Sequence, residues 1–339
     1  MTAWHISLVI SGSMHGVFVS NSYLKGRKFE EPWEMMSDAA ARAGVRLERL
    51  HNSDLALPLA DHESVSREAG DPDFFLFWDK DVACASNLEL CGYRVFNTSE
   101  CVRVCDDKAL THLILARSGV RSVTTIVCPM SFDDSDDPSF AETAASALGT
   151  PMVLKDRFGS FGQQVRLVKD EAELASALSG RYVPRILQPF VECGGHDVRV
   201  EVVGGRAIAA MGRTAPPGDF RSNATIGGTV SPHVPDDEEA ELAIRACEAV
   251  GADFAGVDIL RTVDGPMVCE VNSNAHIKNL LECTGINAAD AIMSHVIREV
   301  GGRRRAGCST RGGTSNTTGS SQRDLWSRGG PSEWTPRSP

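Results

Sequence analysis

The apolar residues of the chain follow two alternating patterns. Short apolar runs bounded by turn residues, such as Phe74–Trp78, predict buried strands. Apolar residues three and four positions apart, as at Phe29, Trp33 and Met36, predict amphipathic helices. Strands are expected at 5–10, 45–50, 73–78, 123–127, 152–155, 165–168, 198–203, 207–211, 254–260 and 267–271. Helices are expected at 28–43, 106–118, 171–178, 236–249 and 288–299.

The order of these elements predicts an α/β (α+β) protein built from several lobes. Strand–helix–strand order near the start, after a Gly/Ser loop at 11–16, implies a parallel sheet with a crossover connection. The dipeptide Gly204-Gly205 between two expected strands is a strong hairpin signal. Residues 301–339 contain too few aliphatic residues to form a core. We divide the chain into an N-terminal α/β lobe at 1–104, a small subdomain at 105–185, a C-terminal subdomain at 186–300 and a disordered tail at 301–339.

Composition and charge narrow the classes of partner. The 339 residues carry a formal net charge of −11, which argues against a nucleic-acid partner because phosphate contacts need a basic face. We find no secretion signal at the N-terminus, and no apolar run approaches the ~20 residues of a membrane helix. The ten cysteines include no Cys-x-x-Cys pair, which favours reduced thiols over a zinc site. We therefore expect a cytoplasmic protein without a membrane partner.

Three side chains with oxygen donors lie on two neighbouring strands. Asp258 occupies the middle of an apolar strand, and Glu270 and Asn272 are two residues apart on the next strand, so they project from one face. The short turn between the strands brings Asp258 close to them. Oxygen donors of this kind suit Mg²⁺. The alternative for each residue is structural, because a capped or salt-bridged carboxylate also avoids the cost of burying an unpaired charge.

A first glycine-containing loop is a candidate for binding phosphate. Lys155 ends one expected strand, and Gly159, Ser160 and Gly162 follow before the next strand begins. Glycines let backbone N–H groups approach a phosphate, and the lysine adds positive charge. An ordinary hairpin turn is the alternative.

A second loop, at 218–223, contains Arg221 and Asn223 and follows Arg213 at the end of an expected strand. Arginine and amide side chains among glycines favour a loop that binds an anion or a substrate. A mobile surface loop is the alternative.

Taken in chain order, these motifs resemble one family. The order is Asp107-Lys108, Lys155 with its glycine loop, Gln-Pro-Phe-Val-Glu at 188–192, Asp-Val-Arg at 197–199, Gly-Asp-Phe-Arg-Ser-Asn at 218–223, Gly-Val-Asp at 256–258 and Glu-Val-Asn at 270–272. It resembles the RimK-type branch of the ATP-grasp superfamily, which contains ribosomal-protein glutamate ligases and related amino-acid ligases. The resemblance extends over roughly residues 6–300. It implies an ATP-grasp fold with an N-terminal Rossmann-like pre-ATP-grasp lobe.

The resemblance also implies roles for single residues. The residues that would contact the phosphates of ATP are Lys108, Lys155, Gly159, Ser160 and Gly162. The hinge strand beside adenine would contain Gln188, Phe190 and Val191, with Glu192 or Asp197 at the ribose. One or two Mg²⁺ ions, with Mn²⁺ as an alternative, would be held by Asp258, Glu270 and Asn272. The reacting carboxylate or acyl phosphate would face Arg213, Arg221 and Asn223.

The activity implied by the resemblance is ATP-dependent ligation of a carboxylate to an amine. Transfer of a phosphoryl group to the carboxylate gives an acyl phosphate, and attack by the amine releases phosphate beside ADP. Glutamate is expected as one substrate and a small amino acid as its partner, joined by a peptide or γ-glutamyl bond. A glutamate ligase that modifies the C-terminus of a protein or peptide is an alternative. The oligomeric state is left open, with a homo-oligomer among the options.

Two departures from the family pattern concern loops beside the site. Gln164 stands where many relatives have a further glycine. After Asn272 the chain reads Ser-Asn-Ala-His at 273–276, where many relatives have a small residue and then Ser-Pro-Gly. This segment would border the acceptor pocket, so His276 and Lys278 are candidates for binding an acidic substrate, with a solvated loop as the alternative.

Two other classes of protein compete with a ligase. A nucleotide-binding regulator would keep the fold without turnover, but all three candidate metal ligands are present. A dinucleotide-dependent oxidoreductase would need a Gly-x-Gly-x-x-Gly loop, and the loop at 11–16 contains only two glycines.

Overall fold

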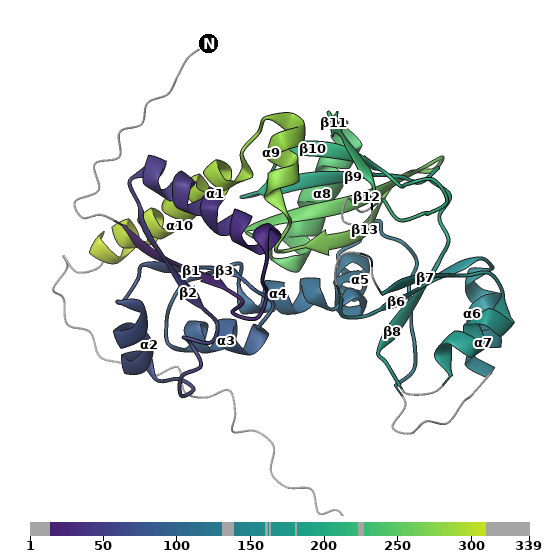
Figure 1. The fold of residues 1–339 in the computed structure, drawn as a ribbon, viewed down its shortest axis with the longest axis horizontal. Coiled ribbons are helices and arrows are strands. Elements are labelled where there is room, and N and C mark those ends of the chain that lie inside the picture. Colours follow the sequence, from purple (N-terminus) through teal and green to yellow (C-terminus); the bar gives the residue numbers. More distant parts are fainter. Residues whose placement is uncertain are drawn as a thin grey trace, which may run out of the picture. The chain divides into compact units, whose positions relative to one another are not determined.

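The computed structural model describes residues 14–130, 139–159, 162, 164–179, 182–222 and 227–309. Backbone contacts separate a unit of residues 1–300 from a second unit of residues 301–339. The described part of the first unit contains three sheets, two of four strands and one of five (Figure 1). The predicted α/β (α+β) class is therefore confirmed.

The N-terminal sheet is parallel and has the strand order β2-β1-β3-β4. Its strands are β1 (His15–Ser20), β2 (Arg46–His51), β3 (Phe74–Trp78) and β4 (Val95–Phe96). The helices that connect them are α1 (Arg27–Ala43), α2 (His62–Ala69) and α3 (Val82–Leu90). The predicted crossover topology is confirmed.

The central strand β1 begins inside the segment that we expected to be a loop. Val17, Phe18 and Val19 are fully buried, but this apolar stretch is short and follows Gly16, and glycine weakens strands. A Cβ atom at Gly16 would lie 2.2 Å from the ring of Phe74 on β3, so the glycine makes room for that ring. The strand expected at 5–10 lies outside the described residues.

The second sheet is antiparallel and has the strand order β5-β8-β6-β7. Its strands are β5 (Ile126–Val127), β6 (Met152–Asp156), β7 (Val165–Val168) and β8 (Arg185–Pro189). The helices α6 (Ser139–Leu148) and α7 (Glu171–Leu178) pack on it around an apolar core of its own. The hairpin predicted from 152–155 and 165–168 is confirmed. The boundary that we placed between 185 and 186 falls inside β8.

The five-stranded sheet is antiparallel and has the strand order β11-β10-β9-β12-β13. Its strands are β9 (His196–Val203), β10 (Arg206–Thr214), β11 (Thr229–His233), β12 (Phe254–Thr262) and β13 (Gly265–Asn272). Helix α8 (Asp237–Val250) begins with a capping box of Asp236 and Glu239 and covers one face, where valines of β9 and β12 are buried. The opposite face presents polar side chains.

Four further helices complete the described chain: α4 (Ser99–Asp106), α5 (Lys108–Arg117), α9 (Ile277–Thr284) and α10 (Ala288–Ser309). The helix expected at 106–118 is confirmed as α5, which begins after its N-cap residue Asp107, whereas the separate helix α4 before it was not predicted. The Asp107 carboxylate accepts hydrogen bonds from the first turn of α5 and pairs with Arg157. The last helix extends beyond the end that we predicted at 299. No helix in the described ranges is long and apolar enough to span a membrane.

Asn97 joins the N-terminal sheet to the five-stranded sheet. Its buried side-chain N–H₂ donates to the carbonyls of Phe254 (2.8 Å) and Ser273 (3.1 Å). Its side-chain oxygen accepts from the backbone N–H groups of Asp253 (2.7 Å) and Phe254 (3.3 Å). Phe18, Phe74, Phe96 and Phe254 share one apolar core beside this junction. The two sheets therefore form one packed body.

Candidate active site

One cavity of about 950 Å³ is lined by all three sheets. Strand β8 and the turn between β6 and β7 form one wall, and the polar face of the five-stranded sheet forms the floor. The C-terminal ends of β1 and β3 and the first turn of α1 form the other side. This volume is at the upper end of the range for ligand pockets.

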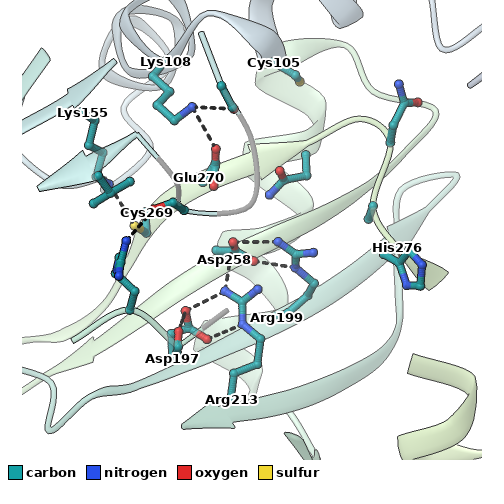
Figure 2. Close-up of a pocket in the computed structure, with 18 of the residues that line it drawn as sticks. Cys105, Lys108, Lys155, Asp197, Arg199, Arg213, Asp258, Cys269, Glu270 and His276 are labelled. Atoms are coloured by element: carbon teal, nitrogen blue, oxygen red, sulfur yellow. Dashed lines mark hydrogen bonds and ion pairs between the residues drawn. The ribbon is translucent and has the colours of Figure 1, made fainter. Parts of the chain in front are cut away.

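Two lysines approach the floor of the cavity, Lys108 from α5 and Lys155 from strand β6 of the antiparallel four-stranded sheet (Figure 2). Lys108 Nζ donates to the carbonyl of Gly159 (3.1 Å) and lies 3.4 Å from Glu270 Oε1. Lys155 Nζ lies 3.6 Å from the sulfur of Cys269. The structure thus brings together both lysines, the glycine turn and β13, as the sequence predicts.

Asp258 lies on the floor between two arginines (Figure 2). Arg199 donates to both carboxylate oxygens (2.6 and 2.7 Å), and Arg213 Nη2 lies 3.0 Å from Oδ2. Burial alone would raise the pKa of Asp258, but the two guanidinium groups lower it to about 2. Asp258 is therefore ionised at neutral pH.

A second ion pair extends this network. Arg213 donates through Nε and Nη2 to the two oxygens of Asp197, both at 2.6 Å, and Ser222 also hydrogen-bonds this carboxylate. Burial disfavours the charge of Arg213, yet Asp258 and Asp197 together hold its pKa above the usual range. The predicted contact of Asp197 with ribose would therefore have to share a carboxylate that already has these partners.

The three candidate metal ligands converge on this floor. Asp258 is opposite Glu270 and Gly256 is opposite Asn272 in the register of β12 and β13, and all three candidate side chains line the cavity. Asn272 Nδ2 is buried without a hydrogen-bond partner in the described structure. Among the described residues no group of three His, Cys, Asp or Glu side chains is arranged as a metal site. Two carboxylates and an amide oxygen fit Mg²⁺.

A buried histidine of α5, His112, hydrogen-bonds Gln188 on strand β8. Gln188 Nε2 lies 2.9 Å from both His112 Nε2 and Thr125 Oγ1. Burial, followed by the nearby charge of Lys155, lowers the pKa of His112 to about 4, so the neutral ring accepts from Gln188. Phe190 and Val191 line the cavity. Glu192 is not among the lining residues and accepts from the N–H of Gly194 (3.0 Å).

The predicted substrate loop is only partly described. Arg221 lines the cavity, but its guanidinium bonds Asp219 and the carbonyl of Gly162 (2.9 Å). A direct contact of Arg221 with a reacting carboxylate would require its guanidinium to break hydrogen bonds with Asp219 or Gly162. Ser160 and Asn223 lie outside the described residues.

Two residues of the site had no assigned role in the sequence prediction. Arg199 belongs to a quoted motif, and its position two residues after Asp197 on one strand was the available signal for its place on the floor. His112 gave no such signal, because a histidine within a helix pattern does not reveal a partner on a distant strand.

Glu201, on the same strand face as Arg199, gives a prediction about pH. Burial raises its pKa from 4.5 to about 7; the charge of Arg199 opposes this effect and that of Asp258 adds to it, both to a smaller extent. Between these values the unfolded chain binds fewer protons than the folded one, so stability falls as pH rises. Glu201→Gln should remove this dependence and be more stable than the wild type at pH 8 by about 3 kcal/mol. Urea unfolding of both proteins at pH 5 and pH 8 measures this difference in stability. An equal pH dependence of the two proteins would contradict the prediction.

Comparisons with known proteins agree with this geometry. Residues 105–296 match the RimK-like ATP-grasp domain family. A protein of Xanthomonas euvesicatoria pv. vesicatoria named "Probable alpha-L-glutamate ligase" is 35% identical over 230 residues, covering 66% of this chain and 75% of that protein. The fold is similar to that of a RimK domain ATP-grasp protein from Sphaerobacter thermophilus (TM-score 0.63, 22% identity, 82% of this chain and 98% of that one). It is also similar to D-alanine–D-alanine ligase from Bacillus anthracis in complex with ATP (TM-score 0.63, 16% identity, 88% and 100%).

The fold and the family match together define an ATP-grasp ligase, an enzyme. The chain belongs to the RimK-like ATP-grasp family. The predicted family and the predicted ATP-grasp fold are both confirmed, whereas the division into subdomains stays a prediction.

Proposed function

We propose that this enzyme uses ATP and Mg²⁺ to activate a carboxylate as an acyl phosphate and joins it to an amine. The observation that carries the proposal is one cavity in which Lys108 and Lys155 face Asp258, Glu270 and Asn272. Cations on one side and oxygen donors on the other suit a triphosphate with its metal. The complex of a similar fold with ATP supports the same choice of nucleotide.

We assign the nucleotide to the side of the cavity formed by the antiparallel sheet of β5, β8, β6 and β7. Phe190 and Val191, at the end of β8, would border adenine through backbone groups. Lys108, Lys155 and the glycine turn at 159–162 would contact the phosphates. Glu192 points its carboxylate at the N–H of Gly194, so a contact with ribose would require that bond to open.

The metal would be held by Asp258, Glu270 and Asn272. Bound Mg²⁺ would offset phosphate charge and orient the transferred phosphoryl group. Arg199 and Arg213 keep Asp258 ionised and fix its orientation. Lys108 lies 3.4 Å from Glu270 and would offer positive charge beside the phosphates.

The chain's residues act mainly by positioning and by neutralising charge. The ion pairs of Arg213 use Nε and Nη2, so we assign its Nη1 to the reacting carboxylate and to the oxyanion formed when the amine attacks. The carboxylate takes the terminal phosphoryl group of ATP and ADP leaves. The amine, once deprotonated, then attacks the acyl carbon; the amide bond forms as the bond to phosphate breaks, the nitrogen loses a further proton, and phosphate leaves. No side-chain nucleophile is needed.

Glutamate is proposed as one substrate because the curated relative at 35% identity is named an alpha-L-glutamate ligase. A small amino acid is proposed as its partner, and a peptide or protein C-terminus is the alternative. Mn²⁺ as a substitute metal, a cytoplasmic location and a homo-oligomeric state stay predictions from the sequence.

A screen of substrate pairs tests the proposed reaction. Phosphate release should be measured with ATP, Mg²⁺ and pairs of amino acids, with and without glutamate. We expect one phosphate and one ADP for each amide formed, with the product identified by its mass. Formation of AMP and pyrophosphate would contradict an acyl phosphate, and the absence of turnover with every amino-acid and peptide pair would contradict a ligase of this substrate class.

A further inference from the structure

The side of the cavity formed by β1 and β3 contains a carboxylate without a cationic partner. Asp79 follows β3, lines the cavity and is only 6% exposed. It accepts from Asn21 Nδ2 (3.1 and 3.2 Å) and from the backbone N–H of Lys80 (2.7 Å). The side chain of Lys80 pairs instead with Asp106. Within the described ranges, no Lys, Arg or His forms an ion pair with Asp79.

A second acceptor lies beside this carboxylate. Asn274 Nδ2 donates to the backbone carbonyl of Asp79 (2.8 Å). Because that carbonyl can only accept, the orientation of the amide is fixed and its oxygen points elsewhere. Asn274 Oδ1 is buried and has no hydrogen-bond partner in the described structure, and the residue lines the same cavity. The cavity lining therefore contains a carboxylate without a counterion and an unpartnered amide oxygen, joined through the backbone carbonyl of Asp79.

Three basic side chains on this side of the cavity lie beside glutamates. Glu31 lies 3.2 Å from His276 Nε2 and 3.1 Å from Lys278 Nζ, and Arg49 pairs with Glu30. His276 and Lys278 were our candidates for binding an acidic substrate. The charge of Lys278 is paired with Glu31, and burial lowers the pKa of His276, which disfavours its charged form. In Figure 2, His276 is on the opposite side of the view from Lys155, away from the proposed phosphate contacts.

We propose that Asp79 and Asn274 form a subsite for the protonated amino group of the amine-bearing substrate. An ammonium group supplies the positive charge that Asp79 lacks and a donor for the unpartnered Oδ1 of Asn274. The assignment rests on the proposed ligase function and extends it to the recognition of the second substrate. Asn274 is two residues from Asn272, so their Cα atoms are at most about 7 Å apart. The amino group would therefore be held near the proposed metal ligands.

The protonation chemistry of Asp79 is consistent with this subsite. Burial raises the pKa of its carboxyl, and the hydrogen bonds from Asn21 and Lys80 only partly offset this effect. A buried carboxylate without a counterion is costly, and a cationic ligand would offset that cost.

Binding measurements without turnover test the subsite. The full chain, loaded with Mg²⁺ and the non-hydrolysable analogue AMPPNP, is titrated calorimetrically with the L-amino acids and with their 2-hydroxy acid analogues. We expect a wild-type preference for one or more amino acids over the matched hydroxy acid. Asp79→Asn should weaken binding of that amino acid roughly 10- to 100-fold and abolish the preference, because a charge-assisted hydrogen bond is lost. Asn274→Ala should weaken it by a smaller factor.

Glu34→Gln is the control, because Glu34 is a carboxylate of α1 that is not among the cavity-lining residues and whose ion-pair partner is Arg27. This variant should keep the amino-acid affinity within about twofold, and AMPPNP affinity should be unchanged in every variant, which shows that each one folds. The proposal is overturned if the wild type shows no preference for amino over hydroxy compounds, or if Asp79→Asn retains it. Failure of phosphate release would count against the ligase reaction but would leave these binding results unaffected.

Discussion

Replacing Glu270 by alanine is expected to reduce ADP formation by roughly 10³-fold or more. Glu270 is one of three carboxylates on the cavity floor, with Asp197 and Asp258, and it is the ion-pair partner of Lys108. Its loss removes a proposed metal ligand and leaves the lysine charge without its partner. The side chain is partly exposed, so the fold should stay intact. Steady-state ADP production, with circular dichroism as a check of folding, measures the effect.

A matched pair of variants separates charge from shape at this position. Glu270→Gln keeps the volume of the side chain but removes its charge, and it should lose activity nearly as severely as alanine. Glu192→Ala removes a glutamate that is not among the cavity-lining residues and should keep most of the activity. Full activity of Glu270→Ala would show that the metal site has been misplaced.

Replacing Asp258 by asparagine is expected to lower the free energy of unfolding by about 3–5 kcal/mol at pH 7. The change leaves two arginine side chains, Arg199 and Arg213, beside a neutral amide in a buried site. Urea unfolding measures the loss. Asp219→Asn, which removes the partner of the more exposed Arg221, should cost less than about 1 kcal/mol. Equal stability of the wild type and Asp258→Asn would contradict the structural importance of this ion pair.

The same ion pair predicts a dependence on acid. The pKa of Asp258 is about 2 in the folded state, below its ordinary value of 3.8. A depressed carboxyl pKa stabilises the fold above the unfolded value and loses that contribution as pH falls toward the folded one. The difference in stability between the wild type and Asp258→Asn should therefore shrink between about pH 4 and pH 2. A constant difference across this range would show that the charge of Asp258 is not what matters.

The sequence predicted best where local patterns decide the structure. The floor of the site was predictable because a short turn and a period of two fix the neighbours of Asp258 and Glu270 across a hairpin. The turn at Gly204-Gly205 was predictable for the same kind of reason. Strand β1 was less clear, because its start depends on a glycine that makes room for Phe74, and this distant contact leaves no local pattern.

Ion pairing in the site was much harder to predict than the position of its backbone. The sequence placed Asp197, Arg213 and Asp258 in one site but could not show that they form a single network. Likewise, His276 and Lys278 were candidates for a substrate anion until the structure placed Glu31, from a helix far away in sequence, between them. Charged side chains choose partners by tertiary position, which hydrophobic periodicity does not encode.

The four hydrogen bonds of Asn97 affect which parts of the protein a bound nucleotide would connect. They fasten the parallel sheet to the five-stranded sheet, and both sheets share one core, so these two layers must move together. The small antiparallel sheet keeps a core of its own and meets α5 through the pair of Asp107 and Arg157. A nucleotide bound in the cavity would therefore contact two bodies with separate apolar cores, and its binding is expected to hold them together.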